Sequence, residues 1–178
     1  DKLDYSPANR VYAWSFYWQG TGADVKASGD LFIEQALEWF GDKNPAKGTP
    51  WAKANRLADL IRESTTLLIL DGLEPLQYPP GPKQGEIENP AVSLLLRELA
   101  ANNNGLCIIT SRLSISEFAS FSDGRTQSLH LERLSNTDGV QLLSAMGICG
   151  DEMDMESAVE VYSGHPLCLS LLAGYLSV

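Results

Sequence analysis

An uninterrupted apolar run that ends in an acid is the feature that most constrains the fold of this chain. Residues 66–71 read Thr-Leu-Leu-Ile-Leu-Asp. Strands of a parallel sheet have this continuous pattern because both of their faces are buried, whereas half-exposed strands alternate apolar and polar residues. We therefore predict a parallel strand at residues 66–71, buried on both faces, with Asp71 at its carboxyl end.

Three other segments have strand character. Residues 11–17 are aromatic and β-branched and lead into a loop at residues 19–22, and residues 106–111 form a second apolar run. Residues 127–131 are a short candidate strand. We expect these segments to join the strand at residues 66–71 in one sheet.

Apolar residues recur at helical spacing between these strands. Asp30 can cap a helix that ends at Gly41, residues 51–64 carry a second apolar stripe, and Pro90 stands at the first position of a third helix. Repeated Pro and Gly at residues 74–89 exclude regular structure and predict a long surface loop. The alternation of strands and helices implies an α/β domain with a mostly parallel sheet.

The last part of the chain has only helical patterns. Ser135 begins a helix with a capping-box-like signature, and residues 151–163 form another helix. The helix that starts at Pro166 is almost wholly apolar, so we expect it to be buried. We divide the chain into an α/β core, residues 1–131, and a small helical subdomain, residues 132–178.

Charge and cysteine content narrow the classes of function. The 178 residues carry a formal net charge of −10, whereas proteins that bind duplex nucleic acid need clustered Lys and Arg. The three cysteines lie beside apolar residues without metal-ligand spacing, which predicts buried free thiols. There is neither a secretory signal pattern nor an apolar stretch long enough to span a bilayer. We predict a cytoplasmic protein with no nucleic-acid or membrane partner.

Polar residues cluster at the ends of three predicted strands. They lie at residues 15–20, 71–74 and 110–112. In α/β sheets, ligands bind beyond the carboxyl ends of the strands. We therefore place the functional site at this edge of the sheet.

Asp71 and Glu74 are two acids, three residues apart, at the end of an apolar strand, which is a Walker B pattern. The strand would present the Asp71 carboxylate at a fixed point, where it can hold a water ligand of Mg²⁺. Glu74 could orient an attacking water. A plain Asp-Gly turn at the end of a strand is the alternative interpretation.

Thr110, Ser111 and Arg112 follow the next apolar strand. An arginine beside a Walker B acid can sense or stabilise a γ-phosphate, although Arg112 could instead pair with a neighbouring carboxylate. Because the carboxyl ends of parallel strands share one edge, the two motifs together predict a phosphate site.

These motifs resemble the STAND class of signal-transducing P-loop ATPases, which includes NACHT and NB-ARC domains. Residues 11–20 resemble the second strand after the P-loop, residues 67–74 the Walker B strand, and residues 107–112 the sensor strand. Residues 131–147 resemble the entry to the helical subdomain, and residues 164–167 the Gly-x-Pro motif. The glycine that follows the Walker B aspartate favours the NACHT branch.

The resemblance implies an ATP- and ADP-dependent signalling switch with Mg²⁺ that controls oligomerisation of a larger protein, as in bacterial defence or immune-type signalling. Asp71 would act on the metal, Glu74 would orient the attacking water, and Arg112 would act as the γ-phosphate sensor. Thr110 and Ser111 would lie beside the nucleotide. Pro166 would line the adenine pocket, with His165 near the phosphates. Its partners would be nucleotide, other domains of the parent protein, or further copies.

The phosphate-binding loop of that class is missing. No Gly-x-x-x-x-Gly-Lys-Ser/Thr pattern occurs in the sequence. In the family, the strand before that loop lies centrally, next to the sensor strand, so the sheet would be incomplete. We expect the loop to precede these residues in the parent protein. The parent would be a weak ATPase, while this chain alone would bind nucleotide poorly and be inactive.

Two alternatives belong to other classes of function. The chain could be a catalytically inactive scaffold that uses a P-loop-like fold for protein interaction only. It could also be an unrelated hydrolase with Ser111 or Cys107 as nucleophile and His130 or His165 as base, although the sequence indicates no orienting partner for either histidine.

Overall fold

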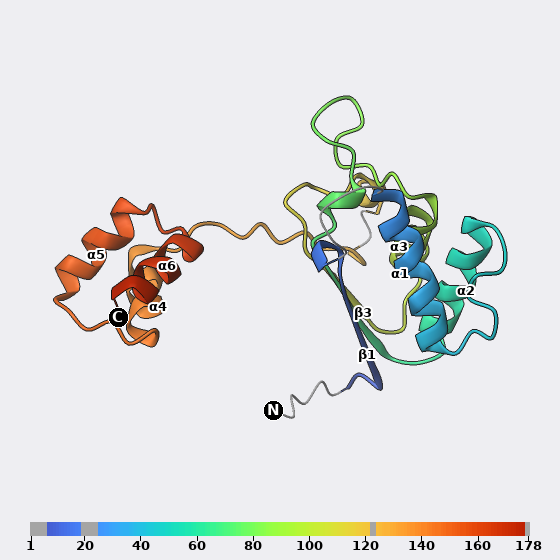
Figure 1. Ribbon diagram of the computed structural model, residues 1–178, viewed down its shortest axis with the longest axis horizontal. Coiled ribbons are helices and arrows are strands. Elements are labelled where there is room, and N and C mark those ends of the chain that lie inside the picture. The colour runs from blue at the N-terminus through green and yellow to red at the C-terminus, as the bar shows by residue number, and fades with distance from the viewer. Residues whose placement is uncertain (1–6, 19–24, 122–123, 177–178) are drawn as a thin grey trace. The chain divides into compact units, whose positions relative to one another are not determined.

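A computed structural model describes residues 7–18, 25–121 and 124–176 (Figure 1). The chain divides into two compact units, residues 1–127 and 128–178. The division predicted after residue 131 stays a prediction, and the loop predicted at residues 19–22 lies outside the described residues.

The first unit contains a parallel sheet of three strands. Its strands are β1 (Arg10–Ser15), β2 (Thr66–Asp71) and β3 (Leu106–Ile109), in the order β1-β2-β3. The register pairs Val11 with Leu67 and Leu67 with Leu106. The prediction of an α/β fold with a parallel sheet and a C-terminal helical subdomain is confirmed.

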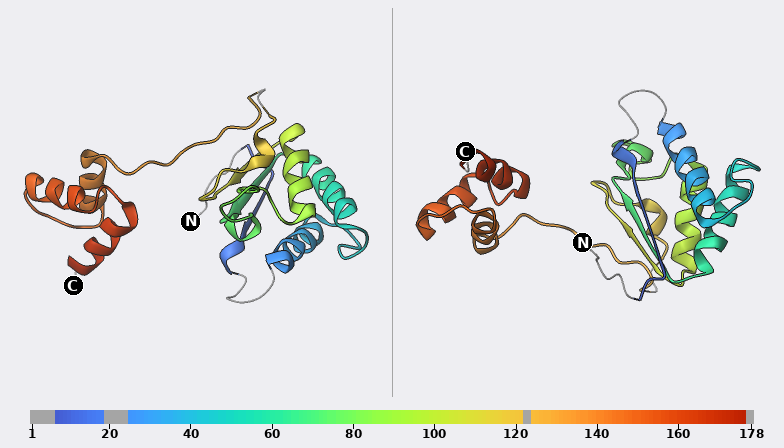
Figure 2. Two further views of the ribbon diagram at one scale, coloured as in Figure 1. Left: turned by 90° about the horizontal axis from the view of Figure 1, so that it is seen from above. Right: turned by 60° about the horizontal axis from the view of Figure 1, so that its bottom comes forward.

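Three helices cover one face of this sheet: α1 (Val25–Phe40), α2 (Pro50–Arg62) and α3 (Pro90–Ala101) (Figure 2). Pro50 and Pro90 occupy the first helical positions, where the missing N–H costs nothing. In each strand, every second side chain points toward the helices, and the apolar stripes of the helices pack on these side chains. The core between the two layers includes Tyr12, Leu68, Leu70, Phe32, Ile33, Leu37, Leu57, Ile61, Leu95 and Leu96.

The opposite face of the sheet is more exposed than its apolar sequence predicts. Leu67 and Ile69 are only partly buried, while Leu106 is 58% and Ile108 is 43% exposed. The expectation that the strand at residues 66–71 is buried on both faces is therefore wrong. All three helices of the unit lie on one side of the sheet, so only alternate residues of β2 are fully buried.

The first helix begins earlier than its sequence indicates. Helix α1 starts at Val25, so Asp30 lies inside it and does not cap it. The Asp30 carboxylate instead accepts a hydrogen bond of 2.9 Å from the side-chain amide of Asn89. The predicted end of the helix is confirmed, because Gly41 follows it with φ of +99°.

Residues 127–131 do not form the predicted strand. They pair with no strand among the described residues, and Leu129 and Leu131 are 75% and 96% exposed. A strand needs a neighbour that takes its backbone hydrogen bonds, so sequence character alone is insufficient here.

The second unit consists of three short helices: α4 (Asn136–Ala145), α5 (Glu152–Val161) and α6 (Pro166–Leu176). Ser135 caps α4, as predicted, and Asp151 caps α5. The small core of the unit is built from Leu143, Val159, Leu169 and Ala173. Each helix therefore contributes at least one buried side chain.

The prediction that α6 is buried is wrong. Leu167, Leu171 and Tyr175 are 62%, 66% and 80% exposed, and they recur every four residues along one side of the helix. Leu169 and Ala173 occupy its buried side. The two short neighbouring helices α4 and α5 can cover only part of the apolar surface of α6.

The structure also bears on possible membrane-spanning helices and on the three cysteines. No helix among the described residues is long and apolar enough to cross a membrane. All three cysteines are free thiols, but Cys149 is exposed and the other two are only partly buried, so the expectation of buried thiols is wrong for Cys149.

Candidate functional site

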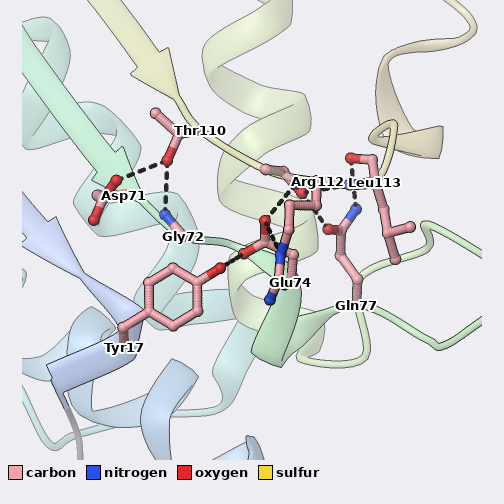
Figure 3. A network of polar contacts seen from close by, with 9 residues as sticks. Tyr17, Asp71, Gly72, Glu74, Gln77, Thr110, Arg112 and Leu113 are labelled. Carbon is pink, nitrogen blue, oxygen red and sulfur yellow. Dashed lines mark hydrogen bonds and ion pairs between the residues drawn. The ribbon is translucent and has the colours of Figure 1, made fainter. Parts of the chain in front are cut away.

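The carboxyl ends of the three strands bring polar side chains together around Asp71, the last residue of the middle strand (Figure 3). From β1, the Ser15 hydroxyl donates to Asp71 Oδ2 at 3.1 Å. From the residue after β3, the Thr110 hydroxyl donates to Asp71 Oδ1 at 2.8 Å and accepts from the backbone N–H of Gly72 at 2.8 Å. Asp71 thus receives one hydroxyl from each neighbouring strand.

Glu74 lies one turn further on, at the start of the short helix η2 (Glu74–Leu76). Tyr17, in the short helix η1 (Phe16–Trp18) that continues β1, donates its hydroxyl to Glu74 Oε2 at 2.5 Å. On the other side, the backbone N–H of Arg112 donates to Glu74 Oε1, and Arg112 Nε lies 3.4 Å from the same oxygen. The contacts are drawn in Figure 3.

The two acids differ in their electrostatic environment. Burial raises the pKa of Glu74, but the hydrogen bonds from Tyr17 and Arg112 and the charge of Arg112 outweigh burial, so the pKa lies below its usual value. The hydrogen bond between Tyr17 and Glu74 also raises the pKa of the Tyr17 phenol. Glu74 is therefore held as a carboxylate first by the hydrogen bond from Tyr17 and then by the backbone N–H and the charge of Arg112.

Within the described part of the chain, the side-chain donors to Asp71 are two hydroxyls. The ion pairs among the described residues leave it without a cation, and its side chain is exposed. No group of three or more His, Cys, Asp or Glu residues in the described part of the chain could hold a metal ion by itself. A single exposed carboxylate suits Mg²⁺, which usually binds one or two protein carboxylates and takes its other ligands from water and phosphate.

Ser111 is directed away from the two acids. Its hydroxyl donates to Gln77 Oε1 at 2.6 Å, while the buried Gln77 amide donates to the backbone oxygens of Gly85 and Ser114, both at 3.2 Å. Gln77 thereby fastens the Pro-rich loop to the segment after β3. Sequence patterns offered no signal for Gln77, because its partners lie in two separate segments, the loop at Gly85 and residues 111–114.

His165 and Pro166 belong to the second unit and are described within it alone. Both are exposed, with Pro166 at the first position of α6. The preceding Gly164 has φ of +64°, and a Cβ there would lie 2.1 Å from the carbonyl oxygen of Leu134. The glycine of this motif is therefore required for packing within the helical unit.

The residues considered for a hydrolase are divided between the two units. Ser111 is bonded to Gln77, and burial raises the pKa of the Cys107 thiol to about 12. His130 and His165 lie in the second unit. An activated nucleophile needs a base within hydrogen-bond reach, and no contact of Ser111 or Cys107 described within the first unit supplies one.

No protein-family model, curated protein or solved structure matches the chain. The function must therefore be inferred from the geometry of the strand ends. They hold Asp71 by Thr110 and Glu74 by Arg112 in two adjacent sets of polar contacts.

Two further hydrogen-bond donors to these acids had no assigned role in the sequence. Ser15 and Tyr17 lie in a segment marked only as a polar strand end. The available signal was the spacing of the two hydroxyls, two residues apart where β1 gives way to η1. Assigning them to Asp71 and Glu74 required the strand order, which the sequence does not state.

Proposed function

We propose that this chain is the larger part of the nucleotide-binding domain of a STAND-type signalling ATPase, similar to NACHT domains. The observation that carries the proposal is the pair of acids at the end of the middle strand, with hydroxyl donors on Asp71 and Arg112 on Glu74. This arrangement suits a phosphate and metal site better than a plain turn, because six polar side chains from three strand ends converge there.

Asp71 would hold a water ligand of Mg²⁺ bound to ATP. The metal supplies positive charge that neutralises the phosphates when nucleotide is bound. Ser15 and Thr110 each donate to one oxygen of Asp71, which orients the carboxylate while leaving lone pairs on both oxygens. Thr110 would lie beside the nucleotide, as would His165 and Pro166 of the helical unit. Ser111 would serve the site only by holding Gln77, to which its hydroxyl is bonded.

Glu74 would orient the attacking water, and Arg112 would sense the γ-phosphate. Arg112 is already charged, 78% exposed and paired with Glu74, so an incoming phosphate would compete with Glu74 for it. We propose that the parent protein hydrolyses ATP weakly. ADP would hold it closed, whereas ATP with Mg²⁺ would open it for oligomerisation.

The phosphate-binding loop would come from outside these residues. Among the described strands, β3 is paired on one side only, by β2, and its other edge is available for an additional strand. Exposed Leu106 and Ile108 flank that edge and would gain burial from such a strand. The sequence contains no Gly-x-x-x-x-Gly-Lys-Ser/Thr loop to cradle phosphates, so this chain alone should bind nucleotide poorly.

Nucleotide binding tests the proposal. Fluorescent ATP and ADP are titrated, with and without Mg²⁺, into this chain and into a longer natural chain that includes the phosphate-binding loop. We expect binding by the longer chain only. Tight binding by the 178 residues alone, or no binding by either chain, contradicts the proposal.

An inactive interaction scaffold is the second candidate. The exposed apolar residues of β3 and its unpaired edge favour it, because such edges recruit other strands. A scaffold would oligomerise normally after Asp71→Ala, whereas a nucleotide switch would not.

A further inference from the structure

Tyr17 makes two contacts that core packing does not explain. Its side chain is 51% exposed, so burial gives little reason for a tyrosine there. Its ring lies against the backbone of Gly72, where a Cβ would come within 2.1 Å of Tyr17 Cε2. Its hydroxyl reaches Glu74 Oε2 at 2.5 Å. The ring thus lies over the residue after Asp71, and the hydroxyl touches the second acid.

The two oxygens of Glu74 are held from opposite sides. Arg112 contacts Oε1 through its backbone N–H and its guanidinium, while Tyr17 contacts Oε2. The guanidinium carbon of Arg112 also lies 6.0 Å from the centre of the Tyr17 ring. A carboxylate with one oxygen bonded can still rotate about its last torsion, whereas one with both oxygens bonded cannot.

We propose that Tyr17 is a positioning residue that fixes the orientation of the Glu74 carboxylate at the end of the sheet. Its role in hydrolysis rests on the proposed function, because Glu74 is the residue that would touch the attacking water. Each carboxylate oxygen has two acceptor sites, so the bond from Tyr17 leaves one site on Oε2 free for that water.

The absence of a side chain at residue 72 is part of this arrangement. Gly72 has φ of +69°, which glycine adopts without strain, and it gives the Tyr17 ring direct access to the backbone. The ring then lies over the backbone at Gly72, between Asp71 and Glu74 in the sequence, and its hydroxyl donates to Glu74. Tyr17 therefore distinguishes the two acids, orienting Glu74 and leaving Asp71 to its hydroxyl donors.

The contact can be measured on the 178-residue chain without nucleotide. In Tyr17→Phe, the ring remains on Gly72 and only the hydroxyl is lost. Carbon-13 NMR of labelled glutamate carboxyls, with the Glu74 signal assigned by its loss in Glu74→Gln, follows the titration. We expect the midpoint of Glu74 to rise in Tyr17→Phe and to stay unchanged in Tyr175→Phe, a control in the second unit. An unchanged midpoint in Tyr17→Phe overturns the proposal.

The reverse titration does not depend on the Tyr17→Phe variant folding. The phenol of Tyr17, followed by its own NMR signal, should titrate at a lower pH in Glu74→Gln than in the unchanged chain, because a hydrogen bond to a carboxylate opposes ionisation of the phenol. Equal midpoints in the two proteins would show that the residues do not interact.

Hydrolysis tests the positioning role itself. In a longer chain that includes the phosphate-binding loop, Tyr17→Phe should lower kcat by about 10- to 100-fold with little change in KM, since misorientation of a catalytic group slows the chemical step rather than binding. A normal kcat contradicts the role. If the longer chain neither binds nor hydrolyses ATP, the proposed function fails, while the two titrations still decide whether Tyr17 holds Glu74.

Discussion

The ring of Tyr17 occupies the space that a side chain on Gly72 would need, because a Cβ there would lie 2.1 Å from Tyr17 Cε2. Gly72 also has φ of +69°, a backbone conformation that costs other residues about 1–3 kcal/mol. Two separate constraints thus require glycine directly after Asp71. One is the backbone conformation of the residue itself, and the other is the position of the Tyr17 ring.

A double-mutant cycle separates these constraints. Gly72→Ala should lower the free energy of unfolding of the first unit by at least about 1–3 kcal/mol from backbone strain, with a further loss from the clash. In a Tyr17→Ala background the clash disappears, so the same substitution should cost less. All four tryptophans lie in residues 1–127, so tryptophan fluorescence during urea unfolding reports on this unit. Strictly additive costs would show that the two residues are not in contact.

The low pKa of Glu74 predicts a dependence of stability on pH. A carboxyl whose pKa is lower in the folded state stabilises the fold above its unfolded-state pKa, and this stabilisation is lost as the pH falls through the folded-state value. Starting from the ordinary value of 4.5, the first unit should lose stability below that pH. Glu74→Gln should reduce this loss, measured by urea unfolding across the acid range. A pH profile unchanged by Glu74→Gln would mean that Glu74 is not held as described.

The two faces of the sheet should respond differently to truncation. Leu68 is 1% exposed and faces the helices, so Leu68→Ala should cost about 2–5 kcal/mol. Ile108 is 43% exposed on the other face, so Ile108→Ala should cost less than about 1 kcal/mol in the isolated chain. Comparable costs in urea unfolding would indicate that another segment covers the outer face.

The cap of α3 should matter more than the cap of α2. Asn89 is 2% exposed, accepts from the backbone N–H groups of Ala91 and Val92, and donates to Asp30. The Thr49 hydroxyl receives one exposed hydrogen bond of 3.3 Å. Asn89→Ala should therefore cost about 2 kcal/mol, and Thr49→Ala about 0.5–1 kcal/mol. The opposite order of the two costs would contradict this description of the α1–α3 contact.

Local patterns were sufficient for most elements of the first unit. The strand at residues 66–71 and the helix after Pro90 are confirmed. A continuous apolar run and a proline at the first helical position favour these structures through residues adjacent in the sequence. The prediction that Asp30 caps a helix failed because its carboxylate bonds in the tertiary structure instead. It accepts a hydrogen bond from Asn89, 59 residues away in the sequence. Residues 127–131 have strand character but no pairing partner in the described chain.

The site was partly predictable. Asp71, Glu74 and Arg112 are marked by their places after apolar strands, and parallel strands necessarily bring such ends to one edge. Tyr17 was not predictable as the partner of Glu74, since that contact spans 57 residues and depends on β1 lying beside β2. The exposed side of α6 was missed because composition does not reveal how many neighbours a helix has.

The Mg²⁺ dependence of ATP binding in Asp71→Asn tests the central claim most directly. Asp59→Asn, a change at an exposed carboxylate on α2, is the matched control. In a longer chain with its phosphate-binding loop, titrations of fluorescent ATP at several Mg²⁺ concentrations should show that Asp71→Asn weakens the apparent Mg²⁺ affinity by about 10- to 100-fold, while Asp59→Asn leaves it unchanged. Equal Mg²⁺ dependence in Asp71→Asn and the unchanged protein would contradict a nucleotide–metal site at the end of β2.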